Sequence, residues 1–423
     1  MSLHIRIEGG VAMTSRRRLS DNRIIFILGF VGFVTSFGAH VVAVNLPVYA
    51  KQVGVGLAVI GVLIAVYDFA EIFAKPAFGW IADRRGLRAT MLVGLAFFSV
   101  ASLAYLLVPP QLLVVIRFLQ GLGAAALSIT SAALVAECFK EKRGRAFGIY
   151  NALKGAGYVL GPTIGGAIVW KLDFSMIFVV TFGVGTLAFA LSLLLPQISA
   201  RAMLNDDGDD DFSLRQMTAA FRDLKLFRWY LVILVNMFMV GILFGFLPVY
   251  VSSLGYDQLK NGLILAGGTA SYLLVQPVAG HLADRFDPTL VVLVGMALSA
   301  LSLVVIPFTA GGILVCAVIV GGIGVGTVWT NTDAVVSNLA EEGHLAATLG
   351  AAGSFKELGD MLGPLLIGIL SQVWGLRVGF IVCGLLGLGG LAVLETGRQR
   401  DVVRVKELRR SVVRFRRVTR AKC

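Results

Sequence analysis

The stretch KPAFGWIADR at residues 75–84 returns as QPVAGHLADR at residues 276–285, which is 201 positions later. Two further pairs lie at almost the same offset: LPVY at residues 46–49 and 247–250, and LKGAGYVLGP at 153–162 with FKELGDMLGP at 355–364. Three matches in the same order and nearly the same register indicate an internal duplication. The chain is therefore expected to contain two copies of one structural unit.

Composition places both copies in a membrane. The chain is 57% hydrophobic and 15% charged, with a mean hydropathy of +0.84, whereas a soluble domain carries about 25% charged residues. Apolar runs of about 20 residues recur, and each can cross a hydrocarbon core of about 30 Å as a helix. The predicted spans are 24–47, 57–79, 89–108, 111–136, 146–170, 174–196, 228–251, 261–281, 289–308, 311–334, 347–371 and 375–394.

The predicted fold is therefore an all-α integral membrane protein with twelve transmembrane helices in two six-helix halves. Because each half has an even number of helices, the halves share one orientation, as parallel repeats do. The expected domains are an N-terminal tail, a first half, a linker, a second half and a basic tail, at residues 1–23, 24–196, 197–227, 228–394 and 395–423. Because Met13 stands directly before TSRRRLSDN, residues 1–12 could be an over-long start.

Lysine and arginine predict the orientation. Of the 37 such residues, 29 fall in the tails and in the loops on one side of the spans. Only Lys51, Lys171, Lys260 and Arg377 fall in the loops on the other side. Because cytoplasmic loops carry an excess of basic residues, we expect a multi-pass protein of the cell membrane with both termini in the cytoplasm. This bias accounts for the net charge of +12 without a nucleic-acid partner.

The tail and the linker each allow two interpretations. In the tail, apolar residues recur every three or four positions among eleven basic ones. This pattern suits an interfacial helix on anionic lipid, and a disordered, solvated tail is an equal alternative. In the linker, NDDGDDD at 205–211 precedes a capping box from Ser213 to Gln216, which predicts a short surface helix. The acidic run is interpreted as a solvated hinge, with cation binding as the alternative.

The six-plus-six repeat and the long central linker resemble the major facilitator superfamily over residues 24–394. GWIADRRGLR is similar to the family's signature between the second and third helices, and the matching residues are Gly79, Asp83, Arg84, Gly86 and Arg88. The second copy keeps Gly280, Asp284 and Arg285 but has FDP where the later glycine would stand. Glycine allows a tight turn, and Asp83 can face the positive end of a helix in the other half. The resemblance implies that this charge biases one arrangement of the halves.

A second signature, RFLQGLG, resembles the family's fourth-helix motif through Arg117, Gln120, Gly121 and Gly123. An arginine inside a span costs about 2.5 to 3.5 kcal/mol unless it faces a wet cavity or a partner. We interpret Arg117 as lining the cavity. The alternative is a side chain that extends to the outer interface.

A third signature lies in GIYNALKGAGYVLGPTIGG, which is similar to the fifth-helix motif of the family's antiporters. The matching residues are Gly148, Gly157, Gly161, Pro162, Gly165 and Gly166, and the second copy retains Gly363 and Pro364. Such residues make a smooth, kinkable helix face that can seal a pathway. Ordinary small-residue packing is the alternative, but the complete pattern favours export over uptake.

We place eight charges in the membrane, four acids and four bases: Asp68, Glu71, Lys75, Arg117, Lys154, Lys356, Glu357 and Asp360. In the family architecture the second helix meets the eleventh and the fifth meets the eighth. Residues four apart can pair on one helix face, which suits Glu71 with Lys75 and Lys356 with Asp360. We expect the charges of the eleventh helix to face those of the second. They could carry protons, gate the pathway or bind substrate, and a carboxyl group in low dielectric can exchange protons near neutral pH.

These observations predict a secondary active transporter that exports small molecules by alternating access, driven by inward proton flow. No phosphate loop, nucleophile motif or metal-ligand spacing is present in the sequence, so neither an enzyme nor a cofactor or metal is expected. The first alternative is uptake or exchange of an organic anion, with Lys154 and Lys356 as paired ligands. The second is a non-transporting sensor or scaffold. Expected partners are a small-molecule substrate, protons and membrane lipid, bound by a monomer.

Overall fold

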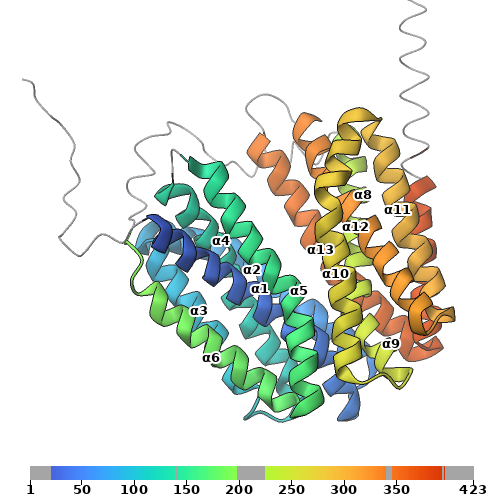
Figure 1. Cartoon of the computed structure of the whole chain (residues 1–423), viewed down its shortest axis with the longest axis horizontal. Coiled ribbons are helices and arrows are strands. Elements are labelled where there is room, and N and C mark those ends of the chain that lie inside the picture. Colours follow the sequence, from blue (N-terminus) through green and yellow to red (C-terminus); the bar gives the residue numbers. More distant parts are fainter. Residues whose placement is uncertain (1–20, 140–141, 198–223, 340–344, 393–394, 396–423) are drawn as a thin grey trace, which may run out of the picture.

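A computed structural model of the chain describes residues 21–139, 142–197, 224–339, 345–392 and 395. Throughout these ranges the regular elements are helices (Figure 1). The first half contains α1 (Asp21–Gln52), α2 (Leu57–Arg85), α3 (Leu87–Ala104), α4 (Leu113–Cys138), α5 (Arg143–Lys171) and α6 (Phe174–Ser192). The predicted helices of the basic tail and of the linker lie outside the described residues.

The second half repeats this order. It contains α8 (Leu224–Gly245), α9 (Leu247–Ser253), α10 (Gln258–Arg285), α11 (Pro288–Val305), α12 (Gly311–Leu339), α13 (Leu345–Trp374) and a last helix, Leu376–Ala392. Helices α8 and α9 together form one span, which is interrupted at Phe246, two residues before Pro248. A proline has no backbone N–H to donate, so it interrupts the helical hydrogen-bond ladder.

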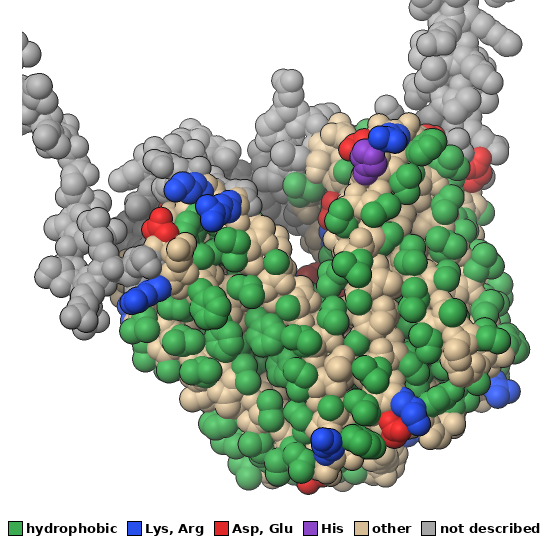
Figure 2. All heavy atoms as spheres, in the orientation of Figure 1, with side chains coloured by type: hydrophobic (Ala, Val, Ile, Leu, Met, Phe, Trp, Pro, Cys, Tyr) green, Lys and Arg blue, Asp and Glu red, His purple; other side chains and the backbone are tan. Residues whose placement is uncertain are grey.

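The described residues account for the twelve predicted spans. Nine helical segments there are long and apolar enough to cross a membrane. Helices α5 and α13 have 29 and 30 residues and carry the polar signatures, and Leu376–Ala392 is a shorter apolar helix. Large hydrophobic side chains cover the outer surface (Figure 2), as lipid contact requires. The prediction of an all-α, twelve-helix fold is confirmed.

The duplication is visible in the helices. Prolines lie inside α2 and α10 at Pro76 and Pro277, which are 201 residues apart, and inside α5 and α13 at Pro162 and Pro364, which are 202 apart. Between the halves, α2 packs against α13 and α5 packs against α10. Both contacts were expected from the family architecture.

The two halves meet at one end and separate at the other (Figure 1). They touch where α2 begins and α13 ends, because Gly61 adjoins Pro364 and Gly368. Toward the opposite end, where α2 and α10 terminate at arginines, a cleft opens between the halves (Figure 2). Trp80 and Val278 near that end are more than half exposed. The structure is therefore open on one side only.

Candidate functional site

The contact between α2 and α13 carries an ion-pair cluster that joins the two halves. The ammonium of Lys75 lies 3.1 Å from Glu71 Oε2 on the same helix and 2.5 Å from Glu357 Oε1 on α13. The three side chains are 28%, 14% and 25% exposed. The expected pair of Glu71 with Lys75 is confirmed. Because one cation serves two carboxylates, Lys75 is shared between the halves.

Two more carboxyl groups lie deeper in the same contact. Asp68 precedes Glu71 by about one turn of α2, and Asp360 follows Glu357 by about one turn of α13. The carboxyls of Asp68 and Asp360 interact electrostatically with each other and with both glutamates. Within the described residues neither makes a hydrogen bond or an ion pair. We name Asp68, Glu71, Glu357 and Asp360, together with Lys75, the seam cluster.

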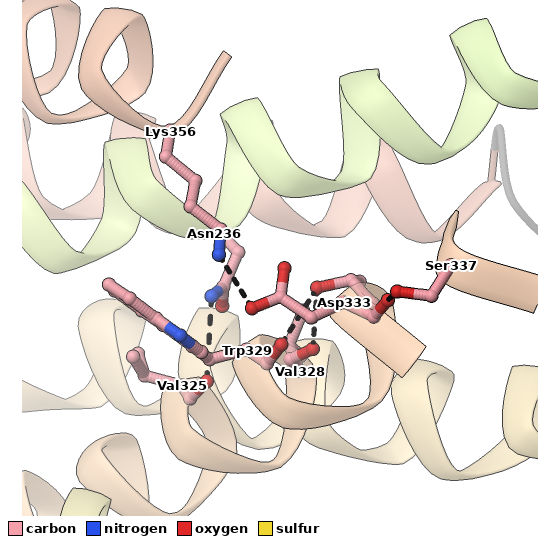
Figure 3. Close-up of polar contacts among 8 residues, drawn as sticks. Asn236, Val325, Val328, Trp329, Asp333, Ser337 and Lys356 are labelled. Carbon is pink, nitrogen blue, oxygen red and sulfur yellow. Dashed lines mark hydrogen bonds and ion pairs between the residues drawn. The ribbon is translucent and has the colours of Figure 1, made fainter. Parts of the chain in front are cut away.

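Lys356 does not join the seam cluster. Its ammonium lies 2.7 Å from Asp333 Oδ2 on α12 and 4.7 Å from the centre of the Trp329 ring (Figure 3). The expectation that Lys356 pairs with Asp360 or faces α2 is wrong. A spacing of four residues makes a pair possible, but the long lysine side chain turns instead to a carboxylate on the neighbouring helix of its own half.

Asp333 is the functional candidate that sequence reasoning missed. It lies in WTNTD, near the end of the predicted span 311–334, and it was not counted among the buried charges. In the structure α12 continues to Leu339, so Asp333 lies within the helix. The available signal was an acidic side chain in a span that is otherwise uncharged. With Asp333 included, the charges placed in the membrane are five acids and four bases, so this set is not balanced.

Arg117 is buried inside the first half. Its side chain is 4% exposed, donates to Gln120 Oε1 at 2.8 Å and stacks 4.3 Å from the centre of the Tyr67 ring. Tyr105 donates to the same amide oxygen at 3.1 Å. Gly121 lets α4 approach the backbone of α2 at Tyr67. The outer-interface alternative does not hold, because Arg117 is held among polar groups beside α2.

Lys154 occupies the position in the first half that matches Lys356, but its surroundings differ. It is partly buried on α5, and it interacts electrostatically with Tyr158, Tyr150 and Glu71. Within the described part of the chain it makes no hydrogen bond or ion pair. The repeat therefore supplies one lysine that has a carboxylate partner and one that lacks it.

The loop signature forms a tight turn between α2 and α3. Gly86 has φ 93°, a conformation that favours glycine, and its N–H donates to Ala82 O. Arg88 donates to Leu193 O at 2.6 Å, near the end of α6, and Arg84 stacks 3.8 Å from the Trp80 ring centre. Asp83 is exposed and makes no hydrogen bond or ion pair among the described residues. Its expected partner in the other half would lie across the open end of the cleft.

The second copy of this turn, between α10 and α11, is stabilised by a helix cap and has no glycine turn. Helix α10 ends at Arg285, after Gly280 and Asp284, and Asp287 Oδ1 accepts a hydrogen bond from Thr289 N at 2.9 Å. Pro288 is the first residue of α11. A capping aspartate followed by proline begins a helix well, so FDP replaces the glycine turn without loss of order.

The glycines of the fifth-helix signature bring α5 against two helices. Gly157, Gly161 and Gly165 adjoin Phe33, Phe37, Val41 and their neighbours on α1, and Gly166 adjoins Gln258 and Gly262 on α10. In the second half, Gly359 and Gly363 adjoin α8 in the same manner, and Gly368 adjoins Gly61 on α2. Gly148 has open space around it. Of these glycines, Gly166 and Gly368 contact the other half at the closed end of the cleft, and the others, apart from Gly148, pack helices of one half together.

The comparison with protein families covers nearly the whole described chain. The family model described as Major Facilitator Superfamily matches residues 28–271 and 258–421. The chain belongs to the major facilitator superfamily. Its members are transporters and not enzymes. The predicted resemblance to the superfamily is thereby confirmed.

Relatives within the superfamily include drug-resistance proteins. The multidrug resistance protein Stp of Mycobacterium tuberculosis is 26% identical over 400 residues, covering 81% of this chain and 74% of Stp. The quinolone resistance protein NorA of Staphylococcus aureus is 29% identical over 176 residues, covering 41% of this chain and 45% of NorA.

Solved transporters share the fold at low sequence identity. The nucleoside transporter NupG superposes with a TM-score of 0.78 at 10% identity, covering 88% of this chain and 98% of NupG. A bacterial homologue of the human lysosomal transporter Spinster has a TM-score of 0.74 at 14% identity, covering 89% and 97% of the two chains. This superfamily chain therefore has a transporter fold throughout both halves.

Proposed function

We propose that this superfamily member is a proton-coupled exporter of small molecules, in which the seam cluster carries the coupling proton. The observation that supports this most directly is the excess of carboxyl groups where the two halves meet. Four carboxyls, from both α2 and α13, gather around the single ammonium of Lys75.

The excess of carboxyl groups affects their ionisation. Carboxylates that share a site repel one another, and not all of them can be ionised at once. Among the described residues, Arg117 on α4 also acts on Asp68, and Lys154 on α5 also acts on Glu71. Of these described groups, four are acids and three are bases, and we propose that the surplus carboxyl holds the proton.

The position of the cluster links this proton to movement of the halves. Lys75 bridges Glu71 in the first half and Glu357 in the second, so a rocking motion of the halves changes the distance between them. When these groups separate, the repulsion that favours protonation falls and the proton can leave. Alternating access would in this way expose the same carboxyls to each side of the membrane in turn.

Export is supported by the relatives and by the fifth-helix signature. The names of Stp and NorA describe multidrug and quinolone resistance. With the orientation predicted from lysine and arginine, the cleft opens toward the cytoplasm, where an exporter collects its substrate. The organic-anion alternative loses part of its basis, because Lys356 is already paired with Asp333 and is not a free partner for Lys154.

Reconstitution tests the proposal. Purified full-length protein in liposomes is given a pH gradient and a panel of radiolabelled small molecules, and both solute and proton movement are followed. We expect solute movement opposite in direction to the proton gradient. Anion accumulation that does not dissipate the pH gradient would support the anion alternative instead, and absence of flux for every solute would support the scaffold.

A further inference from the structure

The ion pair of Lys356 with Asp333 lies apart from the seam cluster, and four helices of the second half supply the residues around it. Asp333 and Trp329 come from α12, Lys356 from α13 and Asn236 from α8 (Figure 3). Tyr272 on α10 adds a second ring beside Trp329. Trp329 packs edge-on to Tyr272, with ring centres 5.7 Å apart. Charge and aromatic surface are thus combined in one place.

The pair is accessible, unlike a structural ion pair of a closed core. The Asp333 side chain is 37% exposed and that of Lys356 is 19% exposed. Asn236 on α8 donates a hydrogen bond at 3.4 Å to the carbonyl oxygen of Val325, which lies one turn before Trp329 on α12. The side-chain oxygen of Asn236 is buried and has no hydrogen-bond partner among the described residues. A buried amide oxygen without a partner carries a desolvation cost that a ligand donor would remove.

We propose that the Lys356–Asp333 pair, with Trp329 and Tyr272, binds the charged and aromatic parts of an aromatic zwitterion. This inference rests on the proposed function, because it names the class of solute that the exporter carries. The substrate ammonium replaces that of Lys356 at Asp333 and over the Trp329 ring. The substrate carboxylate takes the displaced Lys356, and the ring packs against Trp329 and Tyr272.

The balance of charge decides between zwitterion, cation and anion. A cation that takes Asp333 leaves the Lys356 ammonium without its partner, and an anion that takes Lys356 leaves the Asp333 carboxylate alone. Leaving one partner of a buried or partly buried pair uncompensated is costly. A zwitterion re-forms both pairs, so neither charge is stranded. The resting ion pair itself has the charge pattern of such a ligand.

The aromatic residues favour a flat ring in the ligand. Lys356 places its ammonium 4.7 Å from the Trp329 ring centre, which is within the range of a cation–π contact. A ligand ammonium in the same position keeps this contact and brings an attached ring toward the edge-packed Trp329 and Tyr272.

Three probes of one scaffold test the proposal: tryptophan as the zwitterion, tryptamine as the cation and indole-3-propionate as the anion. Equilibrium binding of each radiolabelled probe to the purified full-length protein is measured in detergent, without a gradient. We expect the wild type to bind tryptophan more tightly than either singly charged probe. A wild type that binds no tryptophan, or that prefers a singly charged probe, overturns the proposal.

Two isosteric variants give opposite expectations. Lys356→Met frees Asp333, so the tryptamine-to-tryptophan affinity ratio should rise by at least about tenfold, and Asp333→Asn should shift preference toward indole-3-propionate by a similar factor. Asp333→Asn/Lys356→Met strands neither charge and should fold, yet it should lose the preference for tryptophan. Unchanged ratios in the single variants would contradict the site.

The control is the exposed pair of Lys260 with Asp257, 3.1 Å apart at the start of α10, where Lys260→Met should leave all three affinities unchanged. Because binding is measured without transport, the exporter proposal and the zwitterion-site proposal can be refuted independently. Tryptophan binding with the expected ratios but no proton-driven transport would refute the exporter and leave the site. Proton-driven export of other solutes without these ratios would refute the site alone.

Discussion

Removal of the Lys75 ammonium is the perturbation that the seam cluster predicts most specifically. Lys75→Met keeps the length of the side chain but leaves Glu71 and Glu357 facing each other without a cation. We expect the protein to lose stability and to favour a conformation in which the two halves are further apart. The reason is that the shared cation is replaced by repulsion between carboxyl groups from opposite halves.

The structure sets the magnitude. Breaking a fully buried ion pair costs about 3 to 5 kcal/mol, and breaking an exposed one costs about 0 to 1 kcal/mol. The three side chains here are 14% to 28% exposed, which lies between these limits. We expect Lys75→Met to lower the free energy of unfolding by about 1 to 3 kcal/mol.

A double-mutant cycle separates this interaction from general damage. Glu357→Gln should cost less than Lys75→Met, because Lys75 keeps Glu71 as a partner at 3.1 Å. The double variant should lose less free energy of unfolding than the two single variants lose together, by about 1 kcal/mol or more. Unfolding in mixed detergent micelles measures all three variants, and Lys260→Met at the exposed pair is the matched control. Additive effects, or an equal loss in the control, would refute a shared cation across the seam.

Three further perturbations follow from the same structure. Arg117→Ala should abolish coupled transport but leave membrane insertion intact. An arginine in a span costs about 2.5 to 3.5 kcal/mol on insertion, so α4 without this charge inserts more easily. Normal proton-driven flux in this variant would exclude a role for Arg117 in the pathway. Asp83→Asn should shift the halves toward the arrangement described here by about 0.3 to 1 kcal/mol, since Asp83 makes no hydrogen bond or ion pair among the described residues and its expected helix-end contact can form only when this open end closes; unchanged cysteine labelling of the cleft would contradict this. Gly262→Ala should loosen the closed end because the added methyl would overlap the Pro162 carbonyl, whereas Gly267→Ala on the same helix has open space and serves as control; equal labelling in both would argue against the seal.

The helices could be predicted because each follows from local sequence. An apolar run of about 20 residues can satisfy its backbone in a membrane only as a helix, so the spans depend on nothing distant. The Glu71–Lys75 pair was predictable for a similar reason, since residues four apart lie on one helix face. The contact of Lys75 with Glu357 was anticipated only through the family's arrangement of helices.

The site in the second half could not be predicted in this way. The partner of Lys356 was decided by the packing of α13 beside α12, and helical spacing alone had suggested Asp360. Asp333 was overlooked because it stands near the end of a predicted span, where an acid is expected to be solvated. Which end of the cleft is open also depends on the balance between two arrangements of the same halves, which no local pattern determines.

The central claim is that the seam cluster carries the coupling proton. Its most direct test is to measure substrate exchange and proton-driven substrate accumulation separately. In liposomes loaded with a substrate found by the panel, an Asp68→Asn/Asp360→Asn variant is compared with the wild type for exchange at equal pH and for accumulation under a pH gradient. The account predicts that the variant exchanges substrate but no longer accumulates it when the gradient is applied. Accumulation by the variant as strong as that by the wild type would contradict the account.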